Sequence, residues 1–173
     1  MNALLASLSI GVTLSTLLLS GGLAEASGFK VHNGTLACGG NHFSRLAGSE
    51  QHRTSYTLRN FSGYGRVTIE SIQVFDANGN VLFDFPSVNS ELPAGVKTDL
   101  GPHETTLINT ADILFADLGS PDRPIQTHVE WSYAQGKKDI PLNGSSVRTV
   151  RAAETGAEQS RASSECKLID FRR

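Results

Sequence analysis

The residue types that could do chemistry in this chain gather around its first cysteine. Cys38 and His42 are separated by three residues, and His52 follows further along the chain. A thiolate combined with imidazole nitrogens is a ligand set that suits copper or zinc. One interpretation is therefore a small metal-binding protein that uses Cys38, His42 and His52. The C-x3-H spacing, however, matches none of the established zinc patterns.

The same cysteine has a second use, because the chain contains one other cysteine, Cys166. An even number of cysteines in an exported protein favours pairing. We therefore predict a Cys38–Cys166 disulfide that joins the first and last strands of the domain. A disulfide would remove the thiolate that the metal site needs. Two separate thiols are the remaining alternative.

Compact catalytic motifs are absent from the sequence. It contains no G-x-S-x-G, H-E-x-x-H, P-loop or G-x-G-x-x-G motif. The acidic residues are spread singly, without a close pair typical of a glycosidase. For each histidine we expect an exposed or hydrogen-bonded structural role: His32, His42, His52, His103 and His128. The sequence favours a non-enzymatic protein without a cofactor, and a hydrolase built from distant residues is the weakest alternative.

Three asparagines lie in N-glycosylation sequons, at Asn33, Asn60 and Asn143. Two of the three are followed by glycine, and Asn-Gly is favoured in turns. We therefore prefer the turn interpretation and leave glycosylation open. A further segment from Asp76 resembles the start of a calcium loop, but Val81 stands where such a loop needs glycine. That segment is predicted to be a hairpin turn.

The first 26 residues have the composition of an export signal. Ala3–Ala24 contains no charged residue, and Ala24-Glu25-Ala26 is a small-x-small cleavage signature. The sequence thus predicts a signal peptide over 1–26 and a secreted or periplasmic domain over 27–173. The start of the chain carries no Lys or Arg, and an apolar run of this length could span a bilayer. An uncleaved anchor is therefore an alternative, and lipidation at Cys38 or a non-secreted chain are weaker ones.

The charge balance limits the classes of partner. The formal net charge is −2 at pH 7, so the chain lacks the positive footprint of a nucleic-acid-binding protein and a polybasic segment for anionic lipids. The short basic end at Phe171-Arg172-Arg173 is interpreted as a solvated tail. We expect a protein or surface ligand as partner, no nucleic acid, and no membrane after cleavage of the signal peptide.

Short runs of alternating apolar and polar residues predict β-strands. These strands would position the cysteines and histidines described above. The clearest run is Ile125–Tyr133, where alternation places Val129 and Trp131 on one face and His128 on the other. We predict that this strand is central, with Gln126 and Glu130 beside His128 on the outer face.

Further strands are predicted on both sides of this one, separated by turn residues. They cover 29–38, with a hairpin or kink at Asn33-Gly34, 56–59, 67–75, with a bulge at Glu70–Ser71, 81–83, 97–100, 104–108, 147–150 and 166–169. Ala111–Leu118 is predicted to form one or two helical turns, and Ala152–Ser164 an exposed loop or loose helix.

These elements predict an all-β fold: a two-sheet antiparallel sandwich of immunoglobulin-like architecture with one short helical turn. The Cys and Trp spacing differs from that of true immunoglobulin domains, so the analogy covers architecture alone. Rigid sandwiches commonly present binding loops. We therefore expect a binding function, with Pro86–Gly95 and Asp117–Pro124 as candidate loops.

Overall fold

A computed structural model describes residues 31–40, 43–44, 49–87, 91–114, 124–134 and 140–172. The predicted signal peptide lies outside these residues. Within them, no helix is long and apolar enough to cross a membrane. The elements are β1 (Val31–Gly39), β2 (Phe43–Ser44), β3 (Gln51–Asn60), β4 (Val67–Asp76), β5 (Val81–Phe85), β6 (Asp99–Leu100), β7 (Thr105–Asn109), α1 (Thr110–Ile113), β8 (Pro124–Ala134), β9 (Leu142–Arg151), β10 (Glu158–Glu165) and β11 (Lys167–Arg172).

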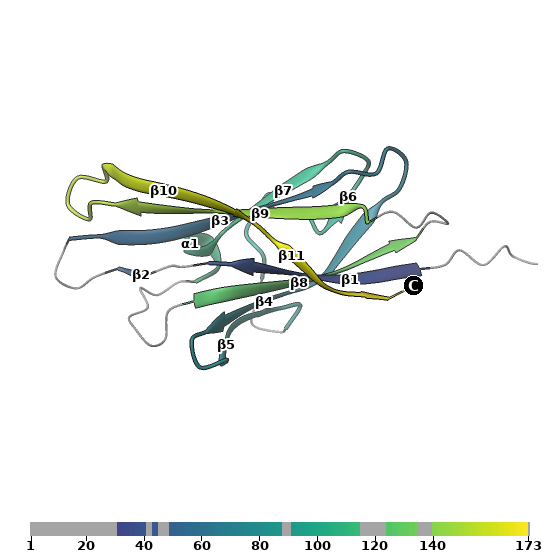
Figure 1. The fold of residues 1–173 in the computed structure, drawn as a ribbon, viewed down its shortest axis with the longest axis horizontal. Coiled ribbons are helices and arrows are strands. Elements are labelled where there is room, and N and C mark those ends of the chain that lie inside the picture. The colour runs from purple at the N-terminus through teal and green to yellow at the C-terminus, as the bar shows by residue number, and fades with distance from the viewer. Residues whose placement is uncertain are drawn as a thin grey trace, which may run out of the picture.

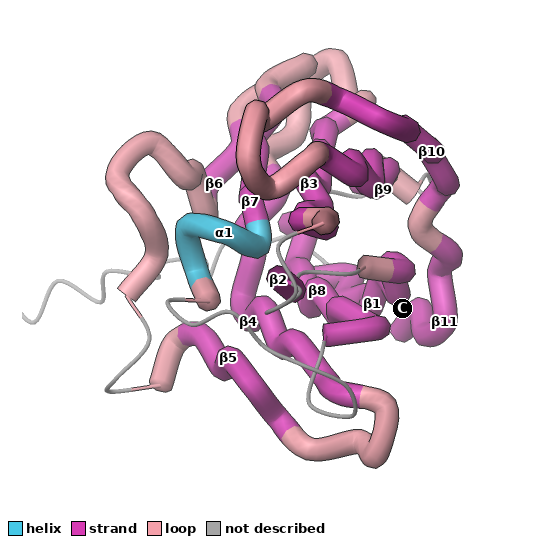
Figure 2. The backbone as a smooth tube through the Cα atoms, turned by 90° about the vertical axis from the view of Figure 1, so that its left-hand side faces the viewer, coloured by secondary structure: helices cyan, strands magenta, loops and turns pink. Residues whose placement is uncertain are grey.

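The strands form two antiparallel sheets that pack face to face, which confirms the predicted β-sandwich (Figure 1). Sheet A has the order β11-β1-β8-β4-β5, with β6 paired to β4. Sheet B has the order β10-β9-β3-β2, with β7 paired to β3. Figure 2 shows the sandwich from one end, with β10 and β11 on the same side of it.

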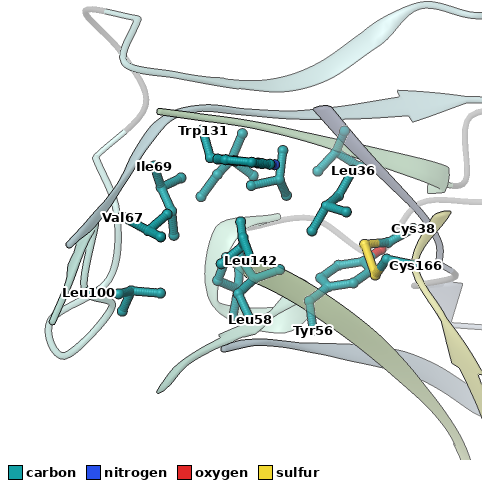
Figure 3. Packing of buried hydrophobic residues seen from close by; sticks show 14 of the residues in the cluster. Leu36, Cys38, Tyr56, Leu58, Val67, Ile69, Leu100, Trp131, Leu142 and Cys166 are labelled. Atoms are coloured by element: carbon teal, nitrogen blue, oxygen red, sulfur yellow. A yellow bond between two sulfur atoms is a disulfide. The ribbon is translucent and has the colours of Figure 1, made fainter. Parts of the chain in front are cut away.

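The predicted core strand is β8, which lies between β1 and β4 in sheet A. Its side chains alternate as predicted: Val129 and Trp131 are buried, whereas Gln126 and Glu130 are exposed and His128 is half-buried. The core is filled from both sheets, with Trp131 and Ile69 from sheet A facing Leu58 and Leu142 from sheet B (Figure 3). Period-two alternation produces this core because successive side chains of a strand point to opposite faces.

Two local predictions in β4 are confirmed. The register between β4 and β8 shifts between Ile69 and Ser71, so Glu70 is the extra residue of a bulge. After β4, the hairpin to β5 turns at Gly79, whose φ is 84°. The Asp76 carboxylate accepts hydrogen bonds from the backbone of Asn78 and from the backbone and side chain of Asn80. The bond from the Asn80 side chain is the main reason that the pKa of Asp76 is lowered.

The prediction of a turn or kink at Asn33-Gly34 is wrong, because β1 runs straight through these residues and pairs with β8 along its whole length. Tertiary packing explains the glycine. A Cβ atom added at Gly34 would lie 2.4 Å from Cζ2 of Trp131. The glycine therefore makes room for the indole ring instead of permitting a turn.

We expect Gly34→Ala to destabilise the domain by about 1–3 kcal/mol, because the added methyl group overpacks the core against Trp131. The matched control is Gly39→Ala in the same strand, where an added Cβ would meet no atom within 4 Å. Urea denaturation followed by circular dichroism measures both variants. Equal denaturation midpoints for the two variants would contradict the packing role of Gly34.

The prediction of an exposed loop or loose helix over Ala152–Ser164 is right for the turn at 152–157 and wrong beyond it, because residues 158–165 form β10. All eight side chains of β10 are exposed, so the strand has no apolar alternation that could reveal it in the sequence. It is held by backbone pairing with β9. The prediction of a short helix is confirmed, since α1 begins directly after Asn109. No side-chain hydrogen bond caps the start of this helix.

Candidate binding groove

The chain crosses from sheet B to sheet A between β10 and β11, and a disulfide holds this crossing. The structure joins Cys38 of β1 to Cys166, with an S–S distance of 2.01 Å. The backbone N–H of Cys166 also donates to the Gly144 carbonyl of β9 at 2.8 Å. Since β11 pairs with β1, the disulfide ties together the first and last strands, as predicted.

Beside this crossing lies an apolar groove of about 390 Å³, which we call the Phe61 groove. It lies between the edges of the two sheets. Its lining residues are Leu36, Phe61, Ile140, Leu142, Asn143, Cys166 and Leu168. Leu36 and Leu142 form its buried floor, whereas Phe61 and Ile140 are 53% and 50% exposed. Two half-exposed apolar side chains above a buried apolar floor form a surface that a ligand could cover.

The Phe61 groove is bordered by backbone that no strand of the described chain pairs. β10 pairs with β9 only from Ser145 onward, so Leu142 has β3 on one side and no strand on the other. Residues of an antiparallel strand direct their N–H and C=O groups alternately to either side. Because Gly144 bonds Cys166 on the β10 side, Leu142 directs its groups to that same side.

One cation lies near the rim of the groove. The Arg59 guanidinium lies over the Phe61 ring, 5.0 Å from its centroid. Lys167 lies between two groove residues, Cys166 and Leu168, but strand alternation directs its exposed side chain to the opposite face, away from the groove. Among the described residues, Arg59 belongs to no ion pair. The rim can therefore attract an acidic group on a ligand.

The sequence analysis missed this groove. Its apolar residues come from separate parts of the chain, and Phe61 lies inside a polar run, Asn60 to Gly63. The only local signal was an aromatic residue directly after a predicted strand. The free edge at Leu142 arises from where β10 leaves β9, which no local pattern encodes.

The structure separates the residues of the predicted metal site. Cys38 is in the disulfide, so its sulfur is not a thiolate. His52 lies beside Glu50, with Nε2 and Oε2 3.1 Å apart, and His42 lies outside the described residues. Within the described residues, no group of three or more His, Cys, Asp or Glu side chains could hold a metal ion.

The other histidines of the described chain occupy separate places. His32 is buried and stacks on Phe171. His128 lies on the outer face of sheet A, beside Phe75 and within 2.7 Å of Gln126. His103 has a positive φ of 60° in the turn between β6 and β7.

Within the described part of the chain, one titratable group, a buried phenol, has a large pKa shift. Burial raises the pKa of Tyr56 to about 12, partly offset by a hydrogen bond with Thr127. The Thr127 hydroxyl donates to the Tyr56 oxygen at 2.8 Å. This bond links β3 of sheet B to β8 of sheet A. Tyr56 is therefore a neutral structural residue at physiological pH.

The predicted loop Pro86–Gly95 is partly described. Its first peptide bond, Phe85–Pro86, is cis, and Gly95 has a φ of 95°. Residues 88–90 lie outside the described chain. So do 117–123 of the second predicted loop, whose last residue, Pro124, begins β8. A binding role of either loop stays a prediction.

The three sequons differ in their surroundings. Asn60 is fully buried, and its amide donates to the carbonyls of Gly65, Leu100 and Gly101. Asn33 and Asn143 are exposed. Burial makes Asn60 a structural residue that joins the end of β3 to β6, whereas Asn143 lies in the wall of the Phe61 groove.

A second hollow, of about 370 Å³, lies on the outer face of sheet A. Its charged and hydroxyl side chains include Glu70, Glu130, Ser132, Asp170 and Arg172. The Ser132 hydroxyl donates to Glu70, and Arg172 pairs with Asp170 at 2.9 Å. The carboxylates of this hollow are exposed, so it is a solvated polar surface.

Comparisons with known proteins assign no family. No family model matches the chain, and no curated protein matches it. Among solved structures, the chain is similar to that reported as the crystal structure of Thermotoga maritima 1070. The similarity has a TM-score of 0.40 and 8% sequence identity, and covers 78% of this chain and 92% of that one. At this level it supports no conclusion about function.

Proposed function

We propose that this protein is an exported, non-enzymatic β-sandwich that binds an extended segment of a partner protein in the Phe61 groove. The disulfide between Cys38 and Cys166 is consistent with an oxidising compartment outside the cytoplasm. The apolar composition of residues 1–26 supports a secreted or periplasmic location. A disulfide-stabilised sandwich is a rigid frame on which a binding surface can be presented.

The observation that carries the proposal is an apolar groove in which two half-exposed side chains, Phe61 and Ile140, lie above a buried floor. An extended segment can direct alternate apolar side chains into such a groove. In this protein, Phe61, Ile140 and Leu168 supply the apolar surface, and Leu142 is buried beneath it. Arg59 favours a segment that also carries an acidic residue. The ligand class is therefore an extended peptide with alternating apolar side chains and a carboxylate.

A peptide array tests the proposal with a defined probe. Ten-residue peptides that alternate Val or Leu with Ser carry one Asp, one Lys or no charge, and binding to the oxidised protein is measured by fluorescence polarisation. We expect the Asp series to bind most tightly. Phe61→Ser is expected to weaken binding about tenfold or more, as loss of an interface anchor does.

The matched control is Leu107→Ser, which removes a side chain of similar exposure, 52%, from β7. This variant is expected to bind like the unaltered protein. Absence of binding throughout the array would contradict the proposal, and so would equal losses in the Phe61→Ser and Leu107→Ser variants. Circular dichroism of both variants checks that each is folded.

A further inference from the structure

The strand β10 forms an edge of sheet B, and its side opposite β9 is unpaired among the described strands. All eight of its side chains are exposed, and of the described strands β9 alone pairs with it. An unpaired edge strand is a template for pairing with another chain, and proteins usually protect such edges with proline, lysine or a covering element. β10 contains neither proline nor lysine, and its charged residues are Glu158, Arg161 and Glu165.

The hydrogen bond at the end of β10 identifies which backbone groups are free. Cys166 bonds Gly144 of β9 through its N–H, and Ser164 and Ala162 lie opposite Ser146 and Arg148 in the same ladder. Because bonding direction alternates along an antiparallel strand, Ser164 and Ala162 direct their N–H and C=O groups to β9. The backbone groups of Arg161, Ser163 and Glu165 therefore point outward.

These three outward residues are complementary to a second copy of themselves. In an antiparallel pair centred on Ser163, Ser163 lies opposite Ser163 of the second copy. Arg161 then lies opposite Glu165 of the second copy, and Glu165 opposite its Arg161. Each of these positions is a hydrogen-bonded pair, because all three residues present free backbone groups. Opposite charges directly across a ladder are stabilising.

Other registers of the β10–β10 pair lack this pairing of opposite charges. A pair centred on Arg161 places two arginines opposite each other, and a pair centred on Glu165 places two glutamates opposite each other. A pair centred on Ser164 brings Arg161 opposite Lys167. Like charges directly across a ladder are destabilising. The small residues Ala162 and Ser164 flank the Ser163 centre, so the favoured register also allows close approach of the two strands.

We propose that the chain forms a two-fold symmetric dimer by antiparallel pairing of β10 with β10 of a second copy, in the register centred on Ser163. Sheet B then continues across both copies. The interface is a single strand pair, which buries less area than the about 800 Å² per partner of a standard interface. The dimer is therefore weak and depends on protein concentration. It goes beyond the proposed peptide-binding function, because the Phe61 groove lies past the end of the β9–β10 ladder.

Analytical ultracentrifugation of the oxidised protein between about 10 µM and 1 mM tests the dimer, in the concentration range expected of so small an interface. We expect Arg161→Glu and Glu165→Arg each to weaken dimerisation about tenfold, because two attractive pairs become repulsive. The double variant Arg161→Glu/Glu165→Arg exchanges the charges and is expected to restore the dimer to within about threefold.

The control is Arg53→Glu, which makes the same charge change at an exposed residue of β3. It is expected to leave dimerisation unchanged. Hydrogen exchange supplies a second readout, since the amides of Arg161, Ser163 and Glu165 should become protected at high concentration. A protein that stays monomeric up to 1 mM overturns the proposal. Failure of the double variant to restore the dimer also overturns the proposal. So does a dimer in which these three amides stay unprotected.

Discussion

Replacement of Trp131 by alanine is expected to lower the free energy of unfolding by about 3–5 kcal/mol, as removal of a large buried aromatic side chain does. Trp131 is 1% exposed. Its ring packs against Gly34 of β1 and lies 5.9 Å from the Phe171 ring of β11. The substitution therefore leaves a cavity that three strands line. Since a domain is stable by only about 5–15 kcal/mol, Trp131→Ala is expected to unfold much of the population.

The control for this prediction is His128→Ala on the outer face of the same strand. His128 contacts Gln126 and Phe75 but lines no part of the core, so we expect a change below about 1 kcal/mol. Trp131 is the only tryptophan, and its fluorescence is lost in the variant. Urea denaturation is therefore followed by far-ultraviolet circular dichroism. Small and equal shifts of the midpoint in both variants would contradict the core position of Trp131.

Removal of the disulfide in a Cys38→Ala/Cys166→Ala variant is expected to cost about 5 kcal/mol in the chain-entropy model. The two cysteines are 128 residues apart, so the bond restricts nearly the whole unfolded chain. The bond also fixes the point where the chain leaves β10 for β11. We expect β10 to be the first part of the fold to open in the variant, because it buries no side chain that could hold it.

Urea denaturation of the oxidised protein, the reduced protein and the double variant measures this effect. Reduction of the disulfide and substitution of the cysteines should lower the free energy of unfolding by similar amounts, because both release the same loop. Both should also steepen the dependence of that free energy on urea concentration, because the unfolded chain expands. Two free thiols in the purified oxidised protein would show that the bond does not form. A loss below about 1 kcal/mol in the double variant would show that β1 and β11 hold together without it.

Sequence patterns predicted the structure correctly where the feature depended on one strand or one hairpin alone. Alternation along 125–133 determined which face of β8 is buried, because the geometry of an extended chain sends successive side chains to opposite sides. The phase shift at Glu70 revealed a bulge for the same reason. The Asn-Gly pair at Asn78 matched a hairpin because neighbouring strands had the length and register to pair around it.

The same dipeptide failed at Asn33, and the comparison shows why. Gly79 has the positive φ that a tight turn requires, whereas Gly34 lies in a strand with an indole ring against it. Glycine allows both a left-handed backbone and a close approach by another side chain. The choice between them depends on Trp131, which lies far from Gly34 in the sequence.

By itself, the sequence determined the all-β class, the buried face of the central strand and the pairing partner available to Cys38, because each depends on residue type and short-range periodicity. Only the tertiary structure decided where β10 lies, since a strand with no buried side chain has no apolar pattern. The Phe61 groove likewise arises where β10 leaves β9 and the chain crosses to β11. Its surface is formed by residues from separate elements, and their proximity depends on long-range pairing of the sheets, which no local pattern of residues encodes.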